Sequence, residues 1–124
     1  MSYDLMVFDP AVAPRNRDDF LSWYDTQTEW AEGHSYDDPQ VTTPALASWF
    51  ADMSQVFPPM NGPLASSDYD NPKVTDYSIG RSVIYAAFAW SQVEAALQAV
   101  DRFAAKHGVG FFNVSSEQGE IRFP

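Results

Sequence analysis

Apolar and polar residues alternate along residues 2–9, and this period of two predicts a β-strand. Leu5 and Val7 fall on one face of this strand, while its other face also carries apolar side chains, so the strand is expected inside a sheet. Further strands are predicted over residues 77–79, 82–90, 109–115 and 120–123. Right-handed crossovers would place the first strand beside residues 82–90, with five residues at the centre of the core: Leu5, Val7, Ile84, Ala86 and Phe88.

Between these strands, apolar residues recur at intervals of three and four, which is typical of helices that bury one side. Residues that commonly cap helices set the expected bounds: from Asn16 or Asp18 to Gly33, from Thr43-Pro44 to Pro58, and from the capping box Ser91–Glu94 to Gly108. Residues 58–74 have no period and contain four prolines, which indicates a long loop.

The element order β-α-α-β-β-α-β-(β) predicts an α+β fold in a single domain covering residues 1–124. A single antiparallel or mixed sheet of 4-5 strands is expected, with about three helices on one face, in an order related to that of ferredoxin-like folds. Four tryptophans fall on apolar faces of the predicted elements and are expected in the core: Trp23, Trp30, Trp49 and Trp90.

The composition fits one self-sufficient domain, since 124 residues that are 45% hydrophobic can bury an adequate core. The chain has no cysteine, which excludes disulfides, thiolate metal sites and cysteine nucleophiles and favours a reducing compartment. The amino terminus lacks a signal-peptide pattern and no window could span a membrane, so we expect a soluble cytoplasmic protein. A formal net charge of −10 argues against binding to nucleic acid or to a membrane.

The acidic residues are concentrated between Asp18 and Asp38, where seven acids occur without one lysine or arginine. A solvated helix face usually mixes both signs, and an unbalanced face of this kind favours rapid capture of a basic protein partner. The alternative is that these charges serve solubility alone. Eight residues of this segment and the later loop are the candidates for partner binding: Asp25, Glu29, Glu32, His34, Tyr36, Asp37, Asp38 and Tyr69.

Two other classes of function stay open. His34 with the nearby carboxylates could serve a small metal-binding or ligand-binding domain or an enzyme, although the one-turn spacing of zinc-binding helices is missing. The nucleophile and phosphate-binding motifs of common enzymes are also missing, so no catalytic residue, metal ligand or cofactor is assigned. A third class is a self-associating protein, in which short edge strands pair across the axis of a homodimer.

The stretches MSYDLMVFDP, TPAL and AWSQVEAALQAVDRFAAKHGVGFFNVS carry a resemblance. Together they resemble a family of small, mostly uncharacterised bacterial proteins that open with S-Y-D-L and carry a strand ending in W-S before a helix. Some members of this family look like immunity proteins encoded beside toxin genes. The resemblance implies no catalytic residues, and it favours a non-enzymatic acidic domain that binds, as an immunity-type inhibitor, a basic bacterial toxin.

Overall fold

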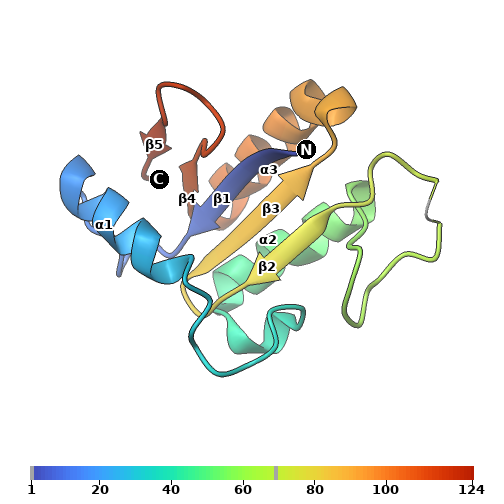
Figure 1. The fold of residues 1–124 in the computed structure, drawn as a ribbon, viewed down its shortest axis with the longest axis horizontal. Helices are drawn as coiled ribbons and strands as arrows, with labels where there is room; N and C mark the ends of the chain where they lie inside the picture. The colour runs from blue at the N-terminus through green and yellow to red at the C-terminus, as the bar shows by residue number, and fades with distance from the viewer. Residues whose placement is uncertain (1, 69) are drawn as a thin grey trace.

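The computed structural model describes residues 2–68 and 70–124, which form an antiparallel sheet of five strands and three α-helices. The strands are β1 (Tyr3–Phe8), β2 (Asp76–Ile79), β3 (Val83–Phe88), β4 (Gly110–Phe112) and β5 (Ile121–Arg122). The helices are α1 (Arg17–Gln27), α2 (Pro44–Val56) and α3 (Val93–His107), with short 3-10 turns at Pro39–Val41 and Trp90–Gln92. The strand order is β2-β3-β1-β4-β5, so the first strand is central (Figure 1).

The predicted α+β class, single sheet and element order are confirmed. β1 pairs with β3 in the expected way, with Val7 opposite Ile84 and Leu5 opposite Ala86. These four residues and Phe88 are all buried in one cluster with side chains of α2 and α3, as predicted from the crossover rule.

The first helix lies elsewhere than expected, because α1 covers the opposite face of the sheet from α2 and α3 (Figure 1). Its buried residue Phe20 packs with Met6 and Phe8, which point away from the face that carries Leu5 and Val7. A strand that is apolar on both faces needs cover on both, and α1 supplies the second cover. Three helices on one face would have left the Phe8 ring in water.

The first helix also ends earlier than Gly33, at Gln27. The hydroxyl of Thr28 donates to the carbonyl of Asp25 at 3.3 Å, which the N–H of Glu29 would have used in a longer helix, and the N–H of Glu29 donates to Thr26 instead. Two residues later Trp30 has a left-handed backbone, with φ of 54°. The chain therefore changes direction after α1, and the segment with His34 does not continue the helix.

The helix caps are partly as predicted. Asn16 and Thr43 each accept a hydrogen bond from the first turn of their helices, and Gly108 ends α3 in the left-handed conformation. The expected capping box Ser91–Glu94 is wrong, because residues 90–92 form a 3-10 turn and the cap of α3 makes no side-chain hydrogen bond.

The prediction that all four tryptophans lie in the core is also only partly right. Trp49 is buried, while Trp23 and Trp30 pack at the edge of the cluster beneath α1. Trp90 is 53% exposed, since it lies in the turn beyond β3 and only leans edge-on against Tyr3. The core prediction is therefore wrong for Trp90.

The free edge of the sheet at β2 is covered at both ends. The N–H of Ile79 donates to the carbonyl of Tyr36 at 2.8 Å. At the other end the N–H of Thr75 donates to Pro58, and its carbonyl accepts from Met60, each at 2.9 Å. Few backbone groups of β2 are therefore left for pairing with a second copy. Self-association through an edge strand stays a prediction, and the covered edge at β2 does not favour it.

Candidate functional site

The outer side of α1 carries three exposed carboxylates, Asp18, Asp19 and Asp25, which we call the acidic stripe. Asp18 and Asp25 are seven residues apart, and two helical turns bring them to the same side, away from Phe20. No lysine or arginine of the described residues lies within ion-pairing distance of the stripe. Glu29, just beyond the helix, is exposed and likewise unpaired within the described residues.

The two arginines that precede the stripe in the chain, Arg15 and Arg17, form no ion pair with it and contact other groups. The Arg17 guanidinium donates to the carbonyl of Gly119 at 2.8 Å, and Arg15 stacks on Phe123 with its guanidinium carbon 4.4 Å from the ring centre. The negative potential of the acidic stripe is therefore left open to solvent.

The segment after α1 is held by Glu32 rather than open to a partner. One oxygen of Glu32 accepts from the backbone N–H of Arg81 at 3.0 Å and lies 2.7 Å from Nε2 of His34. The N–H of Glu32 donates to the hydroxyl of Tyr36 at 2.7 Å. Together these contacts fix the segment on the turn between β2 and β3.

Both ring nitrogens of His34 face acceptors, since Nδ1 lies 2.8 Å from the carbonyl of Ser35 and Nε2 faces Glu32. Only the protonated imidazolium can donate to both at once. The hydrogen bond to Ser35, followed by that to Glu32, raises the pKa of His34 above its ordinary value of 6.5. Among residues 2–68 and 70–124, no three histidine, aspartate or glutamate side chains gather where they could hold a metal ion.

This geometry predicts a titration. Because the folded state raises the pKa of His34, its contribution to stability is fully present below pH 6.5 and is lost as the pH rises through the raised value. An NMR titration of the His34 ring should therefore give a pKa above 6.5, and Glu32→Gln should lower it. A His34 pKa that stays unchanged in Glu32→Gln would contradict the pairing.

The other nominated residues have mostly structural contacts. Asp38 caps the turn that begins at Pro39 by accepting from Gln40 at 2.9 Å. The carbonyl of Asp37 packs so closely on Gly62 that a Cβ there would lie 2.2 Å away. Tyr69 lies outside the described residues.

Seven of the eight nominated residues lie in the described part of the chain, and they divide into two groups. Asp25 and Glu29 are exposed, whereas Glu32, His34, Tyr36, Asp37 and Asp38 are half-buried or tied to neighbouring backbone.

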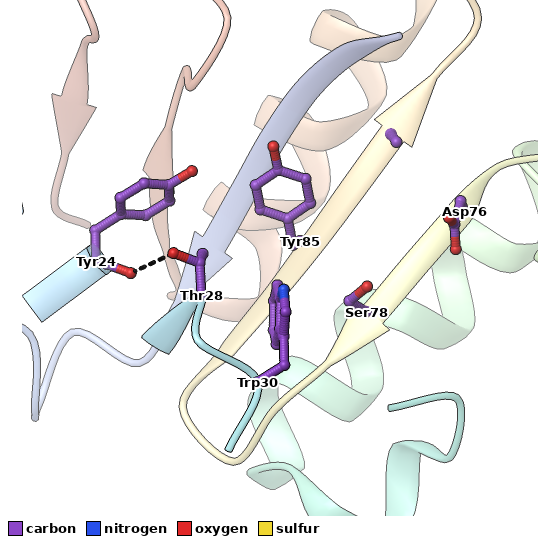
Figure 2. A pocket seen from close by; sticks show the side chains of 7 residues that line it. Tyr24, Thr28, Trp30, Asp76, Ser78 and Tyr85 are labelled. Carbon is purple, nitrogen blue, oxygen red and sulfur yellow. Dashed lines mark hydrogen bonds between the residues drawn. The ribbon is translucent and has the colours of Figure 1, made fainter. Parts of the chain in front are cut away.

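A pocket of about 240 Å³ lies beside α1 on the same face of the sheet, and none of its residues was nominated from the sequence. It is lined by side chains from α1, the following turn, β2 and β3: Tyr24, Thr28, Trp30, Asp76, Ser78, Tyr85 and Ala87 (Figure 2). The pocket exists because α1 covers only the half of this face that holds Phe8 and Phe112. The alternation of side chains along β2 and β3 places the four strand residues of the lining on one face of the sheet. The sequence could have identified them as pocket residues only if α1 had been placed on that face.

The aromatic walls of the pocket are held in place. Trp30 has a left-handed backbone, and its ring packs edge-on against Tyr36 and Tyr85, with centroids 5.2 and 6.1 Å apart. The hydroxyl of Tyr85 donates to the carboxylate of Asp4. Burial is the main cause that raises the pKa of Tyr85 and of Tyr24, so both phenols stay neutral at physiological pH.

Comparison of the chain with protein-family models, with curated proteins and with solved structures gives no match. The described residues contain no helix with the length and apolar character needed to cross a membrane. The features of the chain that bear on function are therefore the acidic stripe and the adjoining pocket.

Proposed function

We propose that this chain is a non-enzymatic, acidic protein-binding domain that captures a basic protein partner through the acidic stripe of α1. The observation that carries the proposal is that exposed carboxylates of α1 form no ion pair with any lysine or arginine of the described residues. The specific form that the sequence resemblance favours is an immunity-type inhibitor of a basic bacterial toxin.

The unpaired charges of the stripe lower the stability of the helix but favour binding of a cationic partner. Like charges along one helix face repel and cost stability, since they forgo the opposite-charge pairs that helices usually form at such spacings. The same charges raise the rate at which a cationic surface is encountered, and they reject acidic partners. A toxin that binds nucleic-acid phosphates presents a cationic cleft, and carboxylates placed there occupy the positions of its substrate's charges.

The contacts of His34 favour this class over a metal-dependent enzyme. A metal ligand needs a free ring nitrogen with a lone pair, whereas both nitrogens of His34 face hydrogen-bond acceptors. The one histidine near the carboxylates is therefore engaged in fixing a loop.

The proposal is tested by capture of the product of the neighbouring gene by the purified chain, at low and at high salt. We expect a basic protein to bind, and its affinity to fall by about tenfold or more between low and high ionic strength, because the charges of the stripe are exposed and are screened by salt. Isothermal titration calorimetry at several salt concentrations measures this dependence. An absence of binding, or binding that salt leaves unchanged, would count against the proposal.

A further inference from the structure

We propose that the pocket between α1, β2 and β3 is a receptor for one cationic side chain of the partner, the guanidinium group of an arginine. This inference rests on the proposed function, because the arginine comes from the basic protein that the acidic stripe attracts. Neither the stripe nor the sequence pattern assigns any role to the pocket residues.

The lining of the pocket matches a planar cation. Three aromatic rings, Tyr24, Trp30 and Tyr85, stand in its wall, and the faces of such rings attract cations. Figure 2 shows the Trp30 ring beside Tyr85 and Ser78, with Asp76 further along β2. Because both tyrosines keep their protons, their hydroxyl groups add hydrogen-bonding partners without altering the charge.

The charge of the lining points to a cation as well. Asp76 is exposed, and its carboxylate forms no ion pair with the described residues, while no lysine or arginine lines the pocket. The hydroxyl groups of Thr28 and Ser78 can accept further N–H donors. A carboxylate and hydroxyl oxygens beside aromatic faces are the partners that a guanidinium uses when it donates and stacks together.

Size and position select a side chain rather than a separate ligand. The pocket volume of about 240 Å³ is below the roughly 300–1,000 Å³ of sites that enclose drug-sized molecules. Tyr24 and Thr28 belong to the same helix and cap as Asp25, so the pocket adjoins the acidic stripe. A partner that lies on the outer side of α1 can therefore extend one residue over its edge into the pocket.

Arginine fits this lining better than lysine. The guanidinium is planar, is less strongly hydrated than an ammonium, and stacks on aromatic rings while it donates sideways. The left-handed backbone of Trp30 is sterically strained, and strained residues of this kind gather at binding sites where the surrounding structure holds them. The strain is consistent with an indole placed for binding.

The test uses N-acetyl-arginine amide as the probe, titrated into the ¹⁵N-labelled chain. Binding in the millimolar range should shift the indole N–H resonance of Trp30, identified by its loss in Trp30→Phe. The citrulline analogue has nearly the same shape without the charge, and we expect it to bind about tenfold more weakly. Asp76→Asn should weaken arginine binding by about tenfold, whereas the control Asp68→Asn, in an exposed loop, should leave it unchanged.

The outcomes separate the pocket from the proposed function. Equal binding of arginine and citrulline amides, or no effect of Asp76→Asn, would overturn the arginine receptor, while salt-sensitive capture of a basic partner would still support the acidic stripe. Arginine binding that needs Asp76, together with no capture of any basic partner, would leave the pocket standing and overturn the proposed function.

Discussion

Phe20→Ala is expected to lower the free energy of unfolding by about 3–5 kcal/mol, because it removes a fully buried ring and leaves a cavity. Phe20 is the buried residue of α1, and its ring packs edge-on against Phe8 and Phe112, with centroids 5.0 and 5.3 Å apart. Since α1 carries the acidic stripe and one wall of the pocket, this variant should also weaken both binding activities.

Urea denaturation of the wild-type chain and of Phe20→Ala measures the loss. The control is Val12→Ala, because Val12 is 52% exposed and its truncation should change the stability by no more than about 0.5 kcal/mol. A loss below about 1 kcal/mol for Phe20→Ala would contradict the packing of α1 on the sheet.

Gly110→Ala is the second change with a large expected effect, a loss of about 3 kcal/mol or more. Gly110 begins β4 opposite Phe8, and a Cβ at this position would lie 2.2 Å from two carbon atoms of the Phe8 ring. The ring has little room to move, since Phe8 is fully buried and also packs on Phe20 and Phe123. The added methyl group must therefore displace β4 or the core beneath α1.

A second glycine substitution separates the effect of the clash with Phe8 from the loss of stability that replacing a glycine causes by itself. Gly33 has φ of 79°, but nothing lies within 4 Å of where its Cβ would be. Gly33→Ala should therefore cost only the strain of a left-handed alanine, about 1–2 kcal/mol. If thermal denaturation shows Gly110→Ala to be no less stable than Gly33→Ala, the close approach of Phe8 to β4 is wrong.

The central part of the fold could be predicted because its signals are local and agree with one another. The strand with Leu5 and Val7, the apolar strand with Ile84, and the helix starting at Thr43 each have a clear period or cap. The handedness of crossovers then fixed which strands are neighbours. These rules were sufficient to place the core between the sheet and α2 and α3.

The side of the sheet that α1 covers was not fixed by those rules. Apolar residues on both faces of the first strand were used only to place it inside the sheet, and a period cannot say which helix covers which face. At the early end of α1 the hydroxyl of Thr28 donates to the carbonyls of Tyr24 and Asp25, and such a local side-chain cap has no strong sequence signature.

The candidate site was predictable only in part for the same reason. The charge segregation of Asp18, Asp19 and Asp25 was visible in the sequence, and helical geometry places Asp18 and Asp25 on one exposed side with Asp19 on its flank. The role of Glu32 is decided by its contact with the backbone N–H of Arg81, far along the chain, and that of His34 by its contacts with Glu32 and Ser35. The pocket joins residues from three elements, so it could not be found before those elements were placed.

The most direct measurement of the central claim compares two variants that lose the same amount of charge. One neutralises the acidic stripe with Asp18→Asn, Asp19→Asn and Asp25→Asn, and the control neutralises exposed acids elsewhere with Asp68→Asn, Asp70→Asn and Glu94→Gln. Both raise the formal net charge of −10 by three. Melting temperatures are recorded alongside, because Asp18 and Asp19 lie in the first turn of α1, where the helix dipole favours them.

The association rate with the basic partner at low salt is the deciding quantity. Our account predicts that the stripe variant associates about tenfold more slowly than the wild-type chain, while the control changes by less than about twofold. Equal slowing of both variants would mean that only the total charge matters, and it would contradict the claim that the acidic stripe is the surface that meets the partner.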